Sequence, residues 1–315
     1  MRSGEPKDVP ASIRQRLLNL AKERREDFTF ILIRYGLERL LVRLSQSEHA
    51  DGFVLKGAML FSLWSGSPHR ATKDMDLLGY GSPDLRRLER VFREIAAMPG
   101  DDGITFLPET VSAIEIREDA IYDGIRVTLQ ARLGAARLAL QVDVGFGDVV
   151  TPAPVDAEYP TLLPMPAARL RVYPREAVIA EKLHAMVDLG IANSRMKDFY
   201  DIWFLSGNFE FDEHLLGQAV AGTFARRGTS LPTQPPLALT DGFALNQSKQ
   251  LQWSAFVARA RLAGGTATLP VVIQQLSRFA KPLFAPPRSN RTIGRWTPAE
   301  GWSNTSRVEQ SEGLY

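Results

Sequence analysis

The first part of the chain carries apolar residues at helical spacing. Between positions 11 and 47 they recur every three or four residues among charged ones: Ile13, Leu17, Leu20, Phe28, Ile31, Leu37, Leu41 and Leu44. A period close to that of the α-helix predicts one or two amphipathic helices with a buried apolar face. We expect residues 1–50 to form N-terminal helices that pack on the core that follows.

Residues 51–167 mix strand and helix patterns. Apolar residues 53–55 lead into a turn at Lys56-Gly57, and residues 58–64 resume a helical pattern. Polar and apolar residues alternate at 72–78, as in a strand. A helix pattern at 85–98 begins with Ser82-Pro83, and further strand patterns lie at 113–116, 125–133 and 136–144. This order predicts an α+β core over residues 51–167.

The second half of the chain is dominated by helix patterns. Residues 151–166 hold five of the 20 prolines, which indicates an irregular crossing and a domain boundary near Ala168. Helical patterns follow at 175–188, 197–205, 213–225, 248–263 and 271–279. We therefore expect a helical domain over residues 168–280. Residues 281–315 lack periodicity and are rich in Pro, Ser, Asn, Arg and Gly, which predicts a flexible tail.

Composition narrows the class of protein. Apolar residues make up 44% and charged residues 23% of the 315 positions, as in ordinary globular proteins. No apolar run approaches the roughly 20 residues of a membrane-spanning helix, so we expect a cytoplasmic protein with no membrane partner. The absence of cysteine excludes disulfides and thiolate catalysis. The formal net charge of +2 means that any nucleic-acid site must be a local feature.

Two aspartates suggest a cation site. Asp74 and Asp76 occupy alternate positions of the predicted strand at 72–78, so their carboxylates project from one face. Their repulsion is relieved by a bound cation. Carboxylate oxygens are hard ligands that suit Mg²⁺ (or Mn²⁺) better than zinc. The alternative is that the pair lies on a solvated strand face.

A turn upstream of the aspartates is a candidate phosphate site. Gly57 lets the backbone approach an anion, and the helix predicted to begin near Ala58 offers amide donors and the positive end of its dipole. Lys56 adds a positive charge, or merely caps the preceding strand. Arg70 precedes the aspartate strand and binds phosphate or remains solvated, and Thr72 begins that strand.

A third aspartate lies far along the chain. Asp143 is placed in the apolar run 138–144, where an unpaired carboxylate is unfavourable. A cation shared with Asp74 and Asp76 would explain its position. A hydrogen-bonded aspartate at a strand end, before Gly145, remains the alternative.

The order of a small-residue turn, a D-x-D strand and a third acidic strand resembles the DNA polymerase β nucleotidyltransferase superfamily. The segments Glu181–Met186 and Arg195–Ile202 extend the likeness to the AbiEii/AbiGii toxin family, so that it covers roughly residues 53–205. The resemblance implies a mixed sheet with flanking helices. It also implies two metal ions held by Asp74 and Asp76 against a nucleoside triphosphate (NTP), while Asp143 helps to hold metal and to activate the acceptor hydroxyl.

The resemblance also assigns residues in the second half. It implies that Lys182 contacts the triphosphate and that Asp198 supports the lysine or the acceptor. Arg195, Lys197 and Asp201 become candidate substrate contacts. From the sequence alone, Lys182 equally forms an exposed helix pair with Glu181, and Asp201 simply forms a salt bridge or stays solvated.

One departure concerns the turn, which usually carries Gly-Gly or Gly-Ser in this family and is Gly57-Ala58 here. The side-chain hydroxyl contact is therefore missing, whereas backbone amides are still available to a phosphate. The nucleotide preference is left open by this change.

The family implies a function for the whole chain. Members are toxins of type IV-like toxin–antitoxin or phage-defence systems that transfer a nucleoside monophosphate (NMP) from an NTP. The expected acceptor is RNA, with the 3′ end of tRNA favoured, and the expected protein partner is an antitoxin encoded nearby. We expect a monomer. The alternatives are transfer to protein or small-molecule hydroxyls, and a catalytically inactive module that binds RNA or protein.

Overall fold

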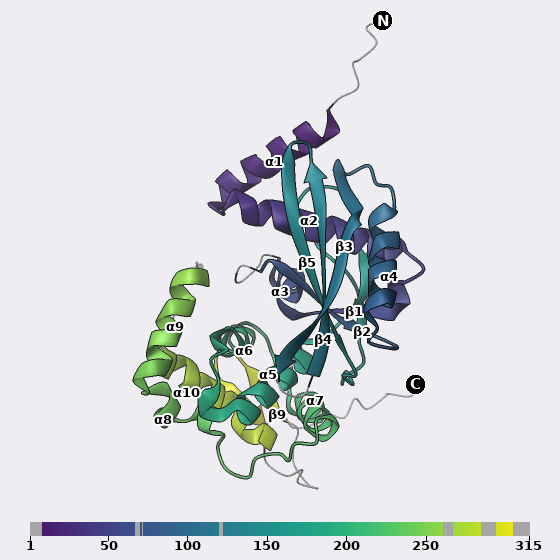
Figure 1. The fold of residues 1–315 in the computed structure, drawn as a ribbon. Helices are drawn as coiled ribbons and strands as arrows, with labels where there is room; N and C mark the ends of the chain where they lie inside the picture. Colours follow the sequence, from purple (N-terminus) through teal and green to yellow (C-terminus); the bar gives the residue numbers. More distant parts are fainter. Residues whose placement is uncertain are drawn as a thin grey trace, which may run out of the picture. The chain divides into compact units, whose positions relative to one another are not determined.

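The structure is a computed structural model that describes residues 8–66, 70, 72–119, 122–260, 262, 267–284 and 294–304. The chain divides into two compact units (Figure 1). Unit 1 contains residues up to Asp148 and Pro154–Tyr173, and unit 2 contains Val149–Ala153 and the residues from Pro174 onward. The chain therefore enters unit 2 at Val149, returns to unit 1 at Pro154 and enters unit 2 again at Pro174. Each unit has its own core and is considered by itself.

Unit 1 is built on a mixed seven-stranded sheet in the order β3-β4-β5-β2-β1-β7-β6. The strands are β1 (Phe53–Lys56), β2 (Asp74–Gly79), β3 (Ile104–Asp119), β4 (Tyr122–Leu133), β5 (Ala136–Phe146), β6 (Val155–Glu158) and β7 (Arg169–Val172). The pairs β2–β5 and β1–β7 are parallel and the other neighbours are antiparallel. The three central strands β5, β2 and β1 carry most of the residues that matter below.

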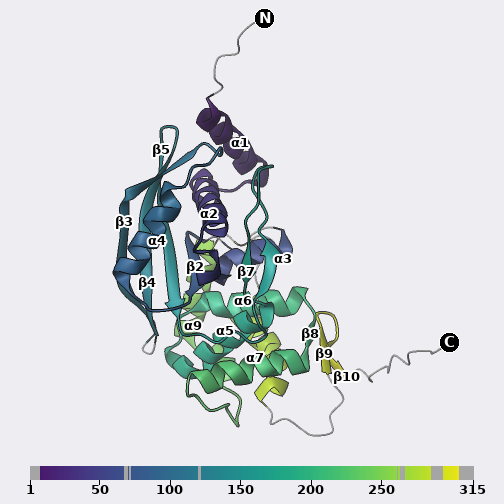
Figure 2. The same cartoon turned by 90° about the vertical axis from the view of Figure 1, so that its right-hand side faces the viewer.

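Helices α2 (Phe28–Gln46) and α4 (Leu85–Ala97) pack on this sheet, and α1 (Val9–Arg24) packs on α2 (Figure 2). Helix α2 approaches β5 so closely that a Cβ on Gly36 would lie 2.9 Å from a methyl group of Leu140. Side chains alternate along β5, so Leu138, Leu140 and Val142 face α2 while Gln141 and Asp143 face the opposite side. The short helix α3 (Leu60–Ser65) follows the 3₁₀ turn η2 (Gly57–Met59) after β1.

Unit 2 is mostly helical. Its helices are α5 (Arg175–Leu189), α6 (Met196–Asn208), α7 (Glu213–Arg226), α8 (Asp241–Ala244), α9 (Gln247–Ala260) and α10 (Leu269–Ala280). A small antiparallel sheet adds β8 (Phe211–Asp212), β9 (Gly294–Thr297) and β10 (Gly301–Asn304). Aromatic rings fill the core, with Phe199 stacked on Phe243 at a centroid distance of 5.2 Å.

The predicted α+β class, with a mixed sheet and flanking helices, is confirmed. The predicted boundary at Ala168 differs from the observed one after Tyr173, because β7 pairs with β1 and β6 and belongs to the sheet of unit 1. Strand β6 lies inside the proline-rich segment, and both strands are only four residues long, so neither was predicted. Among the residues described, no helix has the length and apolar character to cross a membrane.

The predicted tail over residues 281–315 is wrong for residues 294–304, which form the β9–β10 hairpin. Trp296 is 3% exposed and its indole N–H donates to the carbonyl of Ser206 at 2.7 Å. The indole N–H of Trp302 donates to the carbonyl of Phe279 at 2.8 Å. Two tryptophans therefore anchor a segment whose composition indicated disorder. Residues 285–293 and 305–315 of the predicted tail lie outside the described residues.

Candidate active site

Three carboxylates from two neighbouring strands converge in unit 1. Parallel pairing of β2 with β5 places Asp76 beside Asp143, and Asp74 projects from the same face two residues earlier. One oxygen from each of the three lies within 4.8 Å of the others. Asp143 is 6% exposed and the other two are half-buried. The structure thus brings together all three aspartates that the sequence singled out.

Arg126 is a member of this group that the sequence did not reveal. It lies on β4 directly across from Asp143, and its Nε and Nη2 donate to the two Asp143 oxygens at 2.9 and 2.8 Å. The Gln141 amide adds a bond of 3.2 Å to Oδ2. Only the strand register shows this pairing, because Arg126 sits in an alternating strand pattern like many surface arginines.

The turn after β1 lies against Asp76. Gly57 has a φ of 73°, in the left-handed region that favours glycine, and a Cβ there would lie 1.8 Å from Asp76 Oδ2. Ala58 follows and is buried. The helical pattern predicted at 58–64 corresponds to the 3₁₀ turn η2 followed by α3, which is six residues long and has a correspondingly small dipole.

Lys56 faces two residues at the ends of unit 1. Its Nζ lies 3.1 Å from an Asp148 oxygen and 5.7 Å from the ring centroid of Tyr173. The side chains of Lys56 and Asp148 are 13% and 10% exposed. Lys56 is therefore held by a carboxylate that the sequence analysis did not single out, rather than standing as a strand cap in solvent.

Thr72 and Arg70 flank the start of β2. The Thr72 hydroxyl donates to Asp74 Oδ1, which orients that carboxylate. Arg70 is half-buried, and its neighbours 67–69 and 71 are outside the described residues. A cavity of about 40 Å³ lies beside Ala58 and Thr72.

Unit 2 contains a second charged group, which joins α5 to α6. Lys182 Nζ lies 2.6 Å from Asp198 Oδ1 and 2.9 Å from Asp201 Oδ2. Arg195 Nε lies 2.8 Å from Asp198 Oδ2. Both aspartates have fully buried side chains and the Lys182 side chain is 13% exposed. The alternative that Lys182 forms an exposed helix pair with Glu181 is therefore wrong, and so is the alternative that Asp201 stays solvated. The alternative that Asp201 forms a salt bridge is confirmed.

Electrostatics explains why buried carboxylates are tolerated there. Burial alone would raise the pKa of Asp198, but Lys182 and Arg195 outweigh it and hold that pKa below its usual value. Asp198 therefore stays ionised at neutral pH. Lys197, one of the predicted substrate contacts, is exposed on the same helix.

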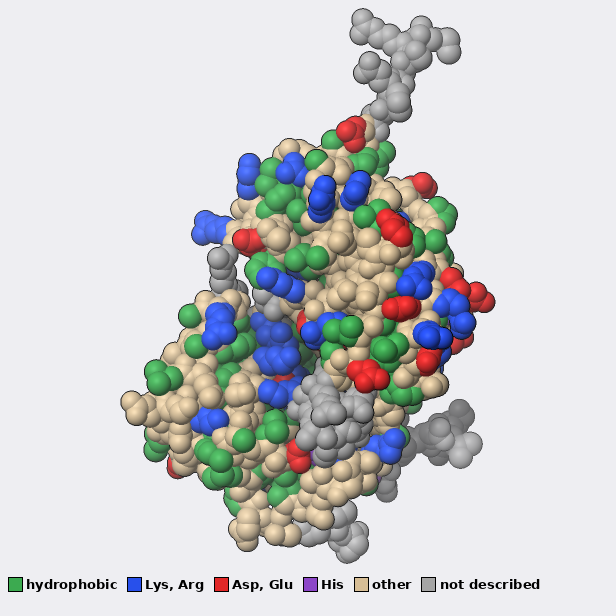
Figure 3. Space-filling model, viewed as in Figure 1, with side chains coloured by type: hydrophobic (Ala, Val, Ile, Leu, Met, Phe, Trp, Pro, Cys, Tyr) green, Lys and Arg blue, Asp and Glu red, His purple; other side chains and the backbone are tan. Residues whose placement is uncertain are grey.

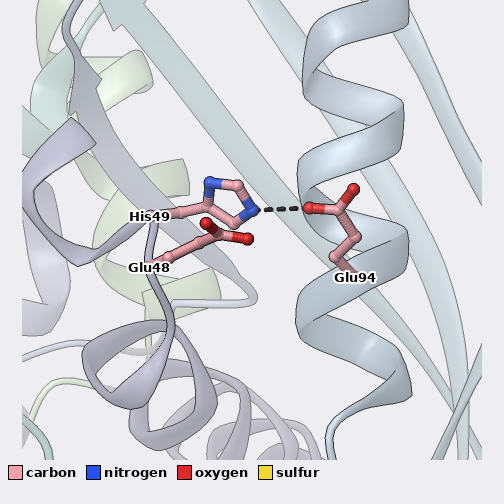
Figure 4. A group of neighbouring side chains, drawn as sticks. All are labelled: Glu48, His49 and Glu94. Atoms are coloured by element: carbon pink, nitrogen blue, oxygen red, sulfur yellow. Dashed lines mark hydrogen bonds and ion pairs between the residues drawn. The ribbon is translucent and has the colours of Figure 1, made fainter.

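A third acidic group lies on the surface of unit 1 (Figure 4). His49 Nε2 is 2.6 Å from Glu94 Oε2, and Glu48 completes the group. Both glutamates are exposed, and Arg90 on α4 also reaches Glu94 at 4.0 Å. We interpret these residues as a surface ion-pair group that links the end of α2 to α4.

A comparison with protein families decides the class of protein. The model described as nucleotidyl transferase AbiEii toxin, type IV toxin–antitoxin (TA) system, matches residues 39–279. The chain belongs to the AbiEii family. It is thus an AbiEii nucleotidyltransferase of type IV toxin–antitoxin systems, and the family predicted from the sequence is confirmed.

Other comparisons are more distant. None of the curated proteins searched matches the AbiEii chain. Among solved structures, JHP933 from Helicobacter pylori has 14% identity and a TM-score of 0.46, over 79% of this chain and 88% of the other. A second H. pylori protein, proposed to be a nucleotidyltransferase, has 15% identity and a TM-score of 0.45, over 81% and 94%.

Nucleotidyltransferases generally use divalent metal ions with an NTP, and the residues of this AbiEii chain fit such an ion. Asp74, Asp76 and Asp143 offer hard oxygen ligands within 4.8 Å of one another. Three carboxylates this close repel one another unless positive charge lies nearby. The group on β2 and β5 is therefore the candidate metal centre.

Proposed function

We propose that this AbiEii nucleotidyltransferase transfers an NMP from an NTP to a hydroxyl of RNA, with the 3′ end of tRNA as the favoured acceptor. The convergence of Asp74, Asp76 and Asp143 carries the proposal, because this group suits Mg²⁺ or Mn²⁺. The RNA acceptor is inferred from the family resemblance. NTP and tRNA are both cytoplasmic, so we propose that the enzyme acts in the cytoplasm.

In the proposed reaction, the acceptor oxygen forms a bond to the α-phosphorus, the bond from that phosphorus to the bridging oxygen breaks, and pyrophosphate leaves. We assign orientation of the acceptor hydroxyl and uptake of its proton to Asp143. Divalent cations, when bound, neutralise the triphosphate and the departing pyrophosphate. Asp74 and Asp76 hold these cations, and the Thr72 hydroxyl fixes the orientation of Asp74.

The turn residues are proposed to bind nucleotide. The backbone at Gly57 and Ala58 approaches Asp76 closely, so that a phosphate held by the turn amides lies next to the metal ligands. Lys56 and Arg70 are proposed to supply positive charge to this side of the sheet, with the pairing of Lys56 to Asp148 setting its position.

We also propose that Lys182 binds a phosphate of the nucleotide and that Asp198 and Asp201 hold its ammonium group in place. Both carboxylates are fully buried and within 2.9 Å of the lysine, which fixes its side chain. Arg195 balances the second negative charge of this group. Arg195 and Lys197 are the further candidates for contact with substrate.

The acceptor can be identified directly. The purified chain is incubated with each α-labelled NTP, Mg²⁺ or Mn²⁺, and either total RNA or a cell lysate, and the label is located. We expect label on tRNA with the wild type and with Asp156→Asn, a control on the exposed edge strand β6. Asp76→Asn should reduce the label to background because a metal ligand is lost.

Each other outcome of this experiment points elsewhere. Label on protein or on small molecules contradicts the RNA acceptor but keeps nucleotidyl transfer. No label with any nucleotide, metal or acceptor contradicts the transfer reaction. Equal labelling by Asp76→Asn and wild type contradicts the assignment of the metal centre.

The toxin role has a separate test in cells. Expression of the wild type should halt growth, and expression of Asp76→Asn should not. Co-expression of the neighbouring antitoxin gene should restore growth, and a locus carrying both genes should reduce phage yield. Growth arrest that persists with Asp76→Asn contradicts a toxicity based on transfer.

A further inference from the structure

Four charged residues form a row across four strands of the sheet. The register places Lys56 on β1 beside Asp76 on β2, Asp76 beside Asp143 on β5, and Asp143 beside Arg126 on β4. Directly paired residues project from the same face of a sheet. The two central carboxylates are therefore flanked by a cation at each end of the row.

The contact between Arg126 and Asp143 engages both oxygens of the carboxylate. Two parallel bonds of 2.9 and 2.8 Å make a bidentate pair, which is the strongest geometry for an arginine with a carboxylate. The carboxylate is only 7% exposed, so solvent screens the pair weakly. The guanidinium thus supplies Asp143 with the positive charge that a divalent cation would otherwise supply.

The other two carboxylates have a different environment. Asp74 receives a neutral hydroxyl donor from Thr72, and the Asp76 carboxylate lies against the Gly57 turn. A cation approaching the three aspartates therefore meets a bidentate guanidinium at Asp143. It must share that carboxylate with Arg126 or displace the guanidinium.

We propose that Arg126 is a built-in counter-cation of Asp143 that weakens divalent cation binding until nucleotide arrives. This inference rests on the proposed metal centre. The Arg126 side chain is 35% exposed, which leaves it accessible to an anionic ligand. Triphosphate oxygens offer the guanidinium an alternative bidentate partner, so that phosphate binding releases Asp143 to the metal. Cation and nucleotide consequently bind together, and Arg126 acts as a positioning residue for Asp143.

The test measures Mn²⁺ binding to the full chain without any turnover. Free Mn²⁺ is titrated by electron paramagnetic resonance, first without nucleotide and then with a non-hydrolysable triphosphate analogue. The variants are Arg126→Gln, Arg126→Lys and the control Arg132→Gln, which removes an exposed arginine from the same strand. Thermal unfolding in EDTA is recorded in parallel for each protein.

Without nucleotide, Arg126→Gln should bind Mn²⁺ about tenfold more tightly than the wild type, because a positive charge next to the ligand has gone. The triphosphate analogue should shrink this difference. Arg126→Gln should also unfold at a lower temperature in EDTA and gain more from Mn²⁺ than the wild type does. Arg132→Gln should match the wild type in each measurement.

An unchanged or weaker Mn²⁺ affinity in Arg126→Gln overturns the inference and leaves the metal centre intact. If Arg126→Gln does not fold, Arg126→Lys decides: it should show a smaller gain in Mn²⁺ affinity, because lysine keeps the charge but loses the contact with both Asp143 oxygens, and an unchanged or weaker affinity overturns the inference. Absence of Mn²⁺ binding in every protein, with and without the analogue, overturns the proposed metal centre together with the inference.

Discussion

The geometry of the candidate site depends on contacts of single residues that their residue type alone does not reveal. Gly57 combines a positive φ with a neighbour, Asp76, that leaves no room for a side chain. Asp143 looks from the sequence like a lone buried acid and is in fact paired with Arg126. In both cases the essential partner lies on another strand.

The role of Gly57 can be tested by comparing Gly57→Ala with Gly66→Ala. Gly57→Ala should reduce nucleotidyl transfer by about two orders of magnitude, since an error of about 1 Å in a catalytic group costs that much. Gly66 has a φ of 72° and open space around it, so Gly66→Ala carries the same backbone strain without a contact to Asp76. In urea unfolding we expect Gly66→Ala to lose about 1–2 kcal/mol of stability from backbone strain, and Gly57→Ala to lose more because its added Cβ also meets Asp76. Equal activity losses in the two variants would show that backbone strain alone is responsible.

The lowered pKa of Asp198 predicts how the stability of the protein depends on pH. Its pKa is below the ordinary value in the folded protein, so its ionised form stabilises unit 2 at pH values above the unfolded pKa of about 4. That stability is lost as pH falls through the lower folded pKa. Urea unfolding of the wild type from pH 6 to pH 2.5 should show this loss below about pH 4.

Asp198→Asn should start less stable at pH 6 and lose less over the same acidic window. Asp188→Asn, an exposed aspartate of α5, should follow the wild type. A wild type and an Asp198→Asn variant with parallel pH profiles would contradict the ionised state that we assign to Asp198.

At the scale of elements, long amphipathic helices and alternating strands were predictable because their patterns are local. Helices α2, α4, α5 and α6 and strands β2 and β5 follow the periodicities that the sequence shows. Strands β6 and β7 and the β9–β10 hairpin were missed because a four-residue strand is too short for its alternation of polar and apolar residues to be recognised.

The candidate site shows the same division. Residue types and their order indicated Asp74, Asp76 and Asp143, and the family resemblance added Lys182 and Asp198. The partners Arg126 and Asp148 depend on which strands are neighbours and in which register they pair, and no single sequence contains that information. Local sequence patterns therefore point to candidate ligands more readily than to the residues that hold them in place.

Two side chains of α4 bond the backbone of the edge strand β3. Strand β3 is an edge strand of 16 residues, and α4 packs against it. Glu89 accepts from the backbone N–H of Ala113 at 3.1 Å, and Arg93 donates to the carbonyl of Val111 at 3.2 Å. The same two side chains form an ion pair at 3.1 Å. Two backbone groups that an additional strand would use are therefore already bonded.

Removing the Glu89–Arg93 pair should leave the edge strand β3 open to pairing with a strand of another molecule. The double variant Glu89→Ala/Arg93→Ala should self-associate at concentrations where the wild type, which we expect to be a monomer, does not. Size-exclusion chromatography with light scattering measures this. Arg90→Ala/Glu94→Ala removes another ion pair from the same helix, together with the His49–Glu94 contact, and leaves Glu89 and Arg93 in place, so it should stay like the wild type. A monomeric Glu89/Arg93 variant at high concentration would show that the edge is protected by other means.

At the scale of the whole molecule, charge is nearly balanced. The chain has 38 Lys and Arg against 36 Asp and Glu, and Figure 3 shows the two signs interspersed over the region of α4. A net charge of +2 provides little long-range attraction for RNA. Recognition of the proposed RNA acceptor would therefore depend on local contacts.

Removal of divalent metal should abolish activity while leaving the protein folded. The three carboxylates of the candidate centre are partly neutralised by Arg126, which bonds Asp143 without any ion. We therefore expect excess EDTA to abolish nucleotidyl transfer while lowering the unfolding temperature by less than about 4 °C, equivalent to under about 1 kcal/mol. Added Mg²⁺ or Mn²⁺ should restore transfer, and calcium, with its looser geometry, should restore it poorly. Circular dichroism and the labelling assay on the same samples measure both effects. Transfer that continues in EDTA would remove the metal from the reaction, and unfolding in EDTA would make it a structural ion instead.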